Sequence, residues 1–202
     1  MKKNLLKILV LSLTAIFVSS CLANYSKKEA NDFIDSNTDK AQENKKIIAD
    51  FYTAFKNGDA EKMASFYHED IEFEDPAFSK LKGKRAGDMW RMLTALSAGN
   101  LKINFSNIKA NDNYGSAEWV ADYNFSQTGR KVHNEIKAFF EFKDGKIYRH
   151  NDYFDLWKWG SQAFGVMGSL LGGTPFFKAK LNEEANKNLD KYISEKAKKN
   201  SL

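Results

Sequence analysis

The chain has 202 residues, of which 43% are hydrophobic, 14% aromatic and 28% charged, a composition typical of a globular domain and not of a disordered chain. Its single cysteine excludes an internal disulfide framework and any metal site with two or more thiolate ligands, and its three histidines lack the His-Glu-x-x-His spacing, so we expect no metal. The formal charge of +5 includes three lysines in the first twenty residues; without them 28 basic residues face 26 acidic ones, and a difference of +2 does not indicate a nucleic-acid partner.

Residues 1–20 are typical of a secretory signal peptide, because two lysines precede an apolar run that is too short to span a bilayer. The run ends in Val18-Ser19-Ser20-Cys21, which resembles the lipobox of bacterial lipoproteins. The resemblance implies that Cys21 is acylated, with palmitate among the acyl chains, and anchors the mature protein to the inner or outer membrane of the cell envelope. A plain signal peptide, or an uncleaved anchor, with an incidental cysteine is the alternative.

A polar segment separates the lipobox from the first strongly apolar pattern. Residues 21–45 are rich in Lys, Asn, Asp and Ser and contain too few large apolar residues to order a core. We expect this segment to be a tether that ends at a domain over 46–175.

The domain begins with three helices. Apolar residues recur at helical spacing from Ile47 to Phe55, and Gly58 ends that helix. Asp59 caps a short second helix, which leads to a strand over 71–75 that is stopped by Pro76. The third helix is expected over 85–96, with Trp90 on its buried face.

The hydrophobic period then changes from 3.6 to 2, which predicts four strands: 101–110, 116–126, 132–142 and 147–156. Helices followed by antiparallel strands indicate an α+β fold. Residues 176–202 form a C-terminal extension with a helix over 178–199, in which seven lysines face four acidic residues. Such a helix would suit an anionic membrane surface, but its narrow apolar stripe favours docking on its own domain.

Three motifs support a family resemblance. They are Phe55-Lys56-Asn57-Gly58-Asp59, Glu74-Asp75-Pro76 with Gly83 beyond it, and Asp144-Gly145-Lys146-Ile147 leading into residues 150–155. Over 46–165 the chain resembles the nuclear transport factor 2-like fold, in its SnoaL-like branch with polyketide cyclases, ketosteroid isomerase and limonene epoxide hydrolase. The resemblance implies a cone-shaped, curved antiparallel sheet packed on the three helices, a pocket inside it, chemistry without a cofactor, and a homodimer through the outer sheet face.

Alternation along the strands sorts the residues of that pocket. We expect the inward sets to be Val132, Asn134, Ile136, Ala138 and Phe140; Tyr148, His150, Asp152 and Phe154; and Glu118, Val120 and Asp122. The third set follows from the resemblance to limonene epoxide hydrolase.

In that enzyme two aspartates flank an arginine, and one aspartate activates water while the other protonates the epoxide oxygen. Asp122 and Asp152 match the aspartates in position, whereas Val120 stands in place of the arginine. His150, on the face of Asp152, is the residue left to supply a proton or a positive charge.

Ketosteroid isomerase offers a second comparison. Its general base lies in a Glu-Asp-Pro context that recurs around Asp75, but its oxyanion donors fall at Phe51 and Ala138, which cannot donate.

The sequence therefore predicts Asp75, Asp122, His150 and Asp152 as acid–base residues, and it predicts a ligand lining of Val120, Asn134, Ile136, Phe140, Trp90 and Trp159. Each has a structural alternative: Asp75 as a turn cap, His150 as a satisfied wall residue, Asp152 as a partner of loop amides, and the tryptophans as core. The predicted function is binding of a small hydrophobic molecule, with hydrolysis or isomerisation. Non-catalytic ligand binding, or envelope assembly through a sheet face with Trp119, Phe139 and Tyr123, are the alternatives.

Overall fold

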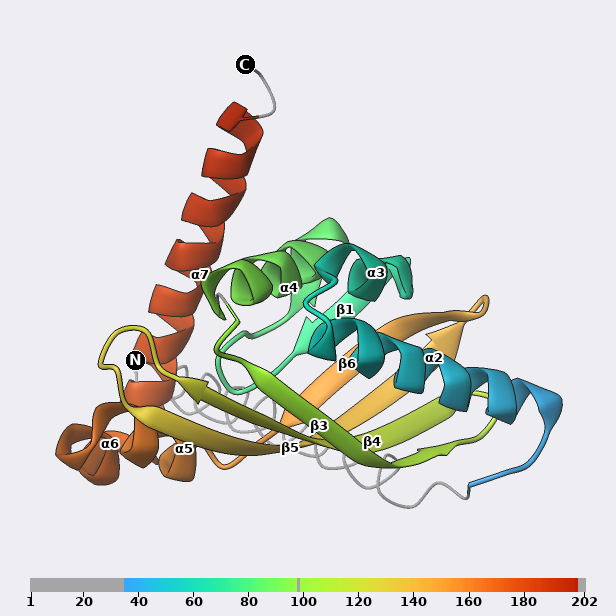
Figure 1. Cartoon of the computed structure of the whole chain (residues 1–202), viewed down its shortest axis with the longest axis horizontal. Coiled ribbons are helices and arrows are strands. Elements are labelled where there is room, and N and C mark those ends of the chain that lie inside the picture. The colour runs from blue at the N-terminus through green and yellow to red at the C-terminus, as the bar shows by residue number, and fades with distance from the viewer. Residues whose placement is uncertain (1–34, 98, 200–202) are drawn as a thin grey trace, which may run out of the picture. The chain divides into compact units, whose positions relative to one another are not determined.

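The computed structural model describes residues 35–97 and 99–199 (Figure 1). The expected signal peptide, the expected lipidation site Cys21 and the first part of the expected tether lie outside the described residues. The elements in chain order are α2 (Asp39–Lys56), α3 (Ala60–Ser65), β1 (Tyr67–Glu74), β2 (Leu81–Lys82), α4 (Lys84–Ser97), β3 (Lys102–Ala110), β4 (Tyr114–Asn124), β5 (Lys131–Lys143), β6 (Lys146–Tyr153), α5 (Leu156–Phe164), α6 (Val166–Leu171) and α7 (Pro175–Lys199).

The three N-terminal helices form where the apolar spacing predicts them. Helix α2 begins at Asp39, seven residues before the expected domain start, because the Thr38 hydroxyl accepts a hydrogen bond from the Ala41 N–H at 3.1 Å and caps it. It ends before Gly58, whose φ of 72° favours glycine. The Asp59 carboxylate caps α3 by accepting from the Lys62 N–H at 2.9 Å.

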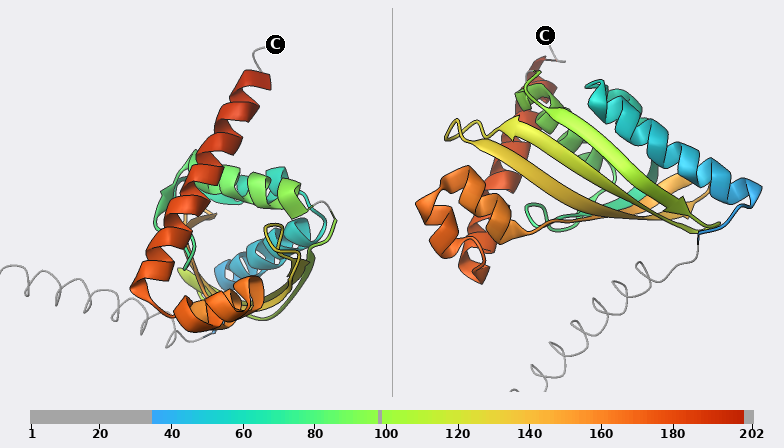
Figure 2. Two further views of the ribbon diagram at one scale, coloured as in Figure 1. Left: turned by 90° about the vertical axis from the view of Figure 1, so that its left-hand side faces the viewer. Right: turned by 60° about the horizontal axis from the view of Figure 1, so that its bottom comes forward.

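The sheet has six strands in the order β2-β1-β6-β5-β4-β3. All neighbours are antiparallel except β1 and β6, which are parallel because β6 returns beside β1 in the same direction after α4 and the β3–β5 meander. The α+β architecture with a curved sheet is confirmed, and the parallel pair makes the sheet mixed. The sheet wraps around α2 and α4 (Figures 1 and 2).

The main core lies between the helices and the inner face of this sheet. It is strongly aromatic, since Phe51, Tyr52, Phe73 and Trp90 are all fully buried there. A smaller cluster around Trp159 joins α5 and α7 to β5.

The C-terminal region contains helices that the sequence pattern did not predict. Strand β6 ends at Tyr153, and Asp155 caps α5 by accepting from the Lys158 N–H at 2.9 Å. Helix α7 lies beside α4 and extends past it (Figure 2). Within the described residues, no helix combines the length and the apolarity needed to cross a membrane.

Candidate active site in the sheet cavity

A cavity of about 470 Å³ opens between the inner face of the sheet, α4 and α7. Its walls are mainly apolar and aromatic: Trp90, Met89 and Leu93 come from α4, while Trp119, Ile136 and Trp159 come from β4, β5 and α5. The polar groups in the wall include Asp75, at the end of β1, and Asp152 on β6. A mainly apolar cavity with a few convergent polar groups is the usual form of a small-molecule site.

Asp152 lies at the end of a buried hydrogen-bond chain. The Trp90 indole N–H donates to the Tyr67 hydroxyl at 2.7 Å, and that hydroxyl lies 2.8 Å from His150 Nδ1. On the other side of the ring, His150 Nε2 lies 3.2 Å from Asp152 Oδ1, which also accepts from the Trp119 indole at 3.1 Å.

The donor and acceptor in each of these hydrogen bonds follow from Trp90, because an indole N–H can only donate. The Tyr67 oxygen accepts from Trp90, so its own O–H donates to His150 Nδ1; burial raises the pKa of Tyr67 well above its usual value and keeps that proton in place. The Nε2–H of His150 then donates to the Asp152 carboxylate, which fixes both the imidazole tautomer and the carboxylate orientation.

Asp75 has a different environment. Its carboxylate accepts from the backbone N–H groups of Ala77 at 2.7 Å and Phe78 at 2.5 Å, and so closes the turn at Pro76. Desolvation nevertheless raises the pKa of Asp75 to about 7, and the charge of Asp152 contributes to the rise, while the two N–H donors oppose it. One cavity therefore holds a carboxyl group with a strongly raised pKa and a second carboxyl group that is hydrogen-bonded to Trp119 and His150.

Tyr123 is a cavity residue that the strand analysis placed on the outer face. Its hydroxyl accepts from the Trp159 indole at 2.8 Å, so its proton is free to point at a ligand. Desolvation raises the pKa of Tyr123, which keeps it a donor.

The expected positions of Asp122 and Val120 are wrong. Residues directly opposite each other in an antiparallel pair share a face, and Ala121 lies opposite Asn134 while Asp122 lies opposite His133. The inward residues of β4 are thus Ala117, Trp119, Ala121 and Tyr123, and Asp122 and Val120 lie on the other face. For the same reason, the outer face lacks two of the three aromatic residues proposed there for envelope assembly.

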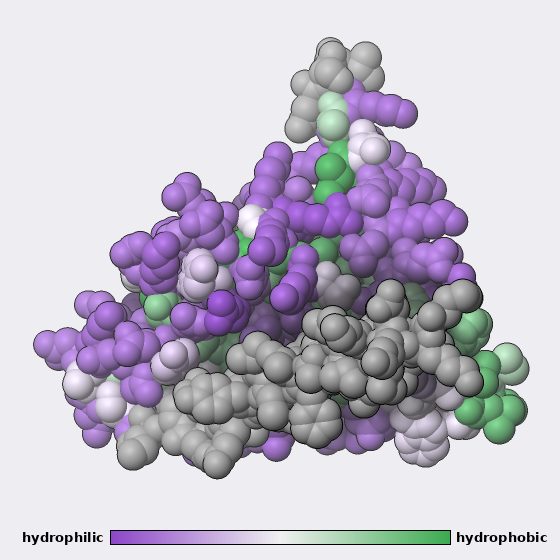
Figure 3. Space-filling model, turned by 180° about the vertical axis from the view of Figure 1, so that it is seen from behind, coloured by the Kyte–Doolittle hydropathy of each residue, from purple (hydrophilic) through white to green (hydrophobic). Residues whose placement is uncertain are grey.

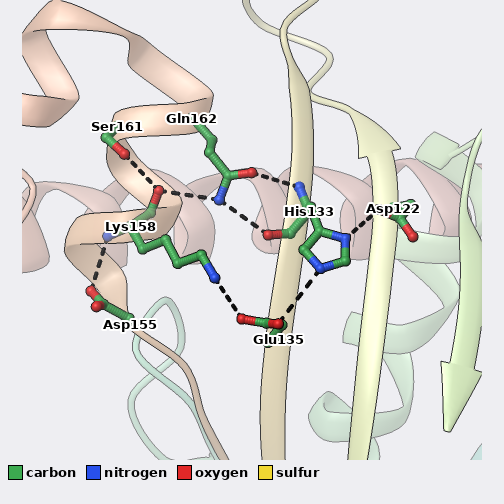
Figure 4. A network of polar contacts seen from close by, with 7 residues as sticks. All are labelled: Asp122, His133, Glu135, Asp155, Lys158, Ser161 and Gln162. Carbon is green, nitrogen blue, oxygen red and sulfur yellow. Dashed lines mark hydrogen bonds and ion pairs between the residues drawn. The ribbon is translucent and has the colours of Figure 1, made fainter.

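Figure 4 shows what Asp122 does instead. Its carboxylate lies 2.7 Å from His133 Nδ1, and His133 Nε2 lies 3.7 Å from Glu135. Lys158 of α5 pairs with Glu135 at 2.5 Å and holds the Glu135 pKa below its usual value, while Gln162 donates to and accepts from the His133 backbone. This exposed network fastens α5 to the outer face of β5, on the opposite face of the sheet from the cavity lining.

The other predicted site residues divide into two groups. Trp90, Asn134, Ile136 and Trp159 line the cavity. His150 and Phe140 are buried behind the wall, with ring centroids 4.4 Å apart, so His150 reaches the cavity only through Asp152.

Helix α7 covers one side of the cavity. Leu181, Glu184, Ala185 and Asn188 line it, and the Asn182 side chain donates to the Pro76 carbonyl at 2.9 Å and accepts from the Ser79 N–H at 3.1 Å. Arg85 of α4 pairs with Asp190 at 2.5 Å. The C-terminal helix is therefore docked on its own domain, as its narrow apolar stripe favoured.

A second, more open cleft of about 650 Å³ runs between α2 and the β5–β6 turn. It is lined by charged side chains of both signs, some of which pair with each other, such as Lys46 with Asp50 at 2.5 Å. It holds no hydrogen-bonded acid–base pair like that of the sheet cavity, so we place the candidate site in the cavity. In the described part of the chain, no group of three or more His, Cys, Asp or Glu side chains is placed to hold a metal ion.

Comparison with known proteins identifies relatives of this fold. The sequence pattern of the SnoaL-like domain family matches residues 48–150. No curated protein sequence matches the chain. Among solved structures, a protein provisionally assigned as a polyketide cyclase from Xanthomonas campestris pathovar campestris is 23% identical with a TM-score of 0.52, covering 61% of this chain and 98% of its own.

Two further solved structures resemble this chain about as closely as the first. An LEH-like epoxide hydrolase of M. tuberculosis is 19% identical with a TM-score of 0.50, covering 66% of this chain and 98% of its own. Bal32a, from a soil-derived mobile gene cassette, is 19% identical with a TM-score of 0.54, covering 61% of this chain and 98% of its own. At these identities the likeness establishes the fold alone.

Proposed function

The chain belongs to the family of SnoaL-like domains, and on that premise we propose that it binds a small, neutral, hydrophobic molecule in the sheet cavity and carries out acid–base chemistry on it without a cofactor. The observation that carries the proposal is the pair of carboxyl groups, Asp75 and Asp152, set in different environments within one apolar cavity. Two carboxyl groups whose environments differ in this way are suited to separate acid and base roles near neutral pH.

The roles follow from the contacts. Asp152, held by the Trp119 and His150 donors, is the base that takes a proton from the ligand or from a water molecule. Asp75, with its pKa of about 7, returns a proton to a developing oxygen, and the Tyr123 hydroxyl is a further donor beside that oxygen. The reaction class is proton transfer or hydrolysis.

The charge of the lining defines the ligand class. Among the described residues that line the cavity there are three carboxyl groups, on Asp75, Asp152 and Glu184, and no lysine, arginine or histidine. A ligand carboxylate or phosphate would meet like charges in a desolvated site, so the ligand carries no negative charge. Its polar part is a carbonyl, hydroxyl or epoxide oxygen that can accept from Asp75 or Tyr123.

A ligand screen tests the cavity assignment. We expect neutral, hydrophobic cyclic ketones, lactones or epoxides to raise the melting temperature of the protein, and Ala121→Phe to remove that rise, because Ala121 lines the cavity and a phenyl group would occupy it. Val120→Phe on the opposite face of β4 is the matched control and should keep the rise. A rise that persists in Ala121→Phe would place the ligand elsewhere.

Ligand binding without turnover is the second candidate. It is favoured by the absence of a cation from the described lining and by the position of Phe51 and Ala138, which lie in the apolar core where ketosteroid isomerase has its oxyanion donors. A ligand that raises the melting temperature but remains unchanged after prolonged incubation would support this candidate.

We also propose that Cys21 anchors the protein to a membrane of the cell envelope. Wild-type protein expressed in a bacterial host should incorporate a labelled palmitate analogue and sediment with membranes, whereas Cys21→Ala should not incorporate the label. Equal labelling of the two proteins would exclude lipidation at this residue. A homodimer through the outer sheet face stays a prediction.

A further inference from the structure

Helix α6 buries Gly168 and exposes its large apolar residues. A Cβ added at Gly168 would lie 1.8 Å from the Gly160 carbonyl oxygen, so the glycine face of α6 packs directly on the backbone of α5. On the rest of the helix, Val166 is 76% exposed, Leu170 71% and Met167 60%. A surface helix of a soluble domain has the reverse arrangement, so this helix is built for a partner that covers it.

The neighbouring segments extend the same surface. We define the α6 patch as Trp157, Val166, Met167, Leu170, Leu171 and Phe176, which are six of the eight large hydrophobic side chains exposed in the described residues. They gather at the end of the molecule formed by α5, α6 and the start of α7, where Figure 3 shows apolar surface. The Trp157 indole donates to the Ser169 carbonyl at 2.9 Å, which holds its ring beside α6.

The charges nearest the patch are mainly positive. From Leu156 to Asn182 the chain contains Lys158, Lys178 and Lys180 and no acidic residue. Lys158 pairs with Glu135 at 2.5 Å and Lys180 with Glu183 at 2.6 Å, so among the described residues Lys178 is the lysine of this segment without an ion pair. The guanidinium of Arg130 lies at the start of α6, about where a side chain of Gly165 would be, and donates to the Gln162 carbonyl at 2.7 Å. An apolar surface with a tryptophan and flanking cations is suited to the interface of an anionic bilayer.

We propose that the α6 patch inserts into the headgroup region of an anionic lipid bilayer. A second copy of the chain fits less well, because a two-fold interface would bring the Lys178 side chains of the two copies together with no acidic residue between 156 and 182 to pair with them, while Lys158 and Lys180 are already paired with Glu135 and Glu183. Anionic lipid headgroups supply the missing charge. The proposal is independent of the cavity chemistry and of Cys21.

The chain from Asp35 onwards is suited to the test, because it forms a compact unit that contains the whole described core. It should sediment with vesicles of phosphatidylglycerol and phosphatidylethanolamine and much less with phosphatidylcholine vesicles. Met167→Asp/Leu170→Asp should weaken that binding at least about tenfold. Replacing Lys178 by glutamine should weaken it about fivefold.

Fluorescence gives a second readout. Trp157 is half exposed while Trp90, Trp119 and Trp159 are buried, so a blue shift of the emission on adding vesicles reports on the patch, and Trp157→Phe should remove it. Tyr114→Asp, at an exposed aromatic outside the patch, is the control and should bind like the wild type.

Four results would overturn the proposal in whole or in part. The first is no binding to anionic vesicles; the second is binding that Met167→Asp/Leu170→Asp leaves unchanged. The third is a concentration-dependent dimer that this double variant dissociates, without vesicle binding, which would assign the patch to contact between copies. Equal binding to phosphatidylcholine would overturn the choice of an anionic surface.

Discussion

Asp152→Asn is expected to lower the turnover of the cavity ligand at least about 100-fold while changing its dissociation constant less than about threefold, because only the proton-accepting group is lost. An asparagine oxygen can still accept from the Trp119 indole and from His150 Nε2, so the wall of the cavity keeps its shape. Turnover of a ligand identified by the thermal screen, measured beside its affinity, gives the result.

The control is the other aspartate of the predicted pair. Asp122 lies on the outer face beside His133, so Asp122→Asn should leave turnover unchanged. Tyr67→Phe should give an intermediate loss and an altered pH profile, because it removes the donor that fixes the His150 tautomer without touching the ligand. If wild type and Asp152→Asn turn the ligand over equally fast, Asp152 is not the base. Ligand binding is then the function that the cavity still supports.

Much of this fold was predictable from local patterns. The three N-terminal helices follow from apolar spacing and from caps such as Asp59, and the period of 2 located β3 to β6 to within a few residues. The parallel pairing of β1 with β6 has no local signal, because strand direction depends on the route of the intervening chain. Helix α6 has no amphipathic signal, because its large apolar residues are exposed and Gly168 is buried, the opposite of the pattern that indicates a helix. Helix α5 buries Trp159 and Ala163 in the ordinary way, but its nine residues follow directly on a strand expected to extend to 156.

The site was predictable in part, and its main error has a clear origin. Along β4 the apolar residues Ala117, Trp119, Ala121 and Tyr123 alternate with Glu118 and Asp122, which by itself indicates that the aromatic set faces inward. The resemblance to limonene epoxide hydrolase outweighed that pattern and inverted the face of the whole strand. The relay from Trp90 through Tyr67 to His150 could not be predicted, since its members come from three elements that meet only in the folded chain.

Asp75 should make the protein less stable as pH rises. The folded protein retains the Asp75 proton up to a pKa of about 7, whereas in the unfolded chain the carboxyl group loses it near its ordinary value of 3.8. Between these two values the folded state binds more protons, so the free energy of unfolding falls with increasing pH and levels off above about pH 7. A shift of this size corresponds to at most about 4 kcal/mol, and the partial exposure of Asp75 to solvent reduces that free energy.

Asp75→Asn isolates this contribution. The asparagine oxygen can accept from the Ala77 and Phe78 N–H groups, so the turn is preserved while the ionisation is lost. Denaturant unfolding of both proteins from pH 4 to 9 should give a difference that grows in favour of the variant between about pH 4 and 7 and is constant above. Asp59→Asn, which keeps a good cap on α3, controls for the loss of one negative charge and should show no such growth. Parallel curves for wild type and Asp75→Asn would mean that Asp75 is ionised in the folded protein at neutral pH, and the acid role would pass to Tyr123.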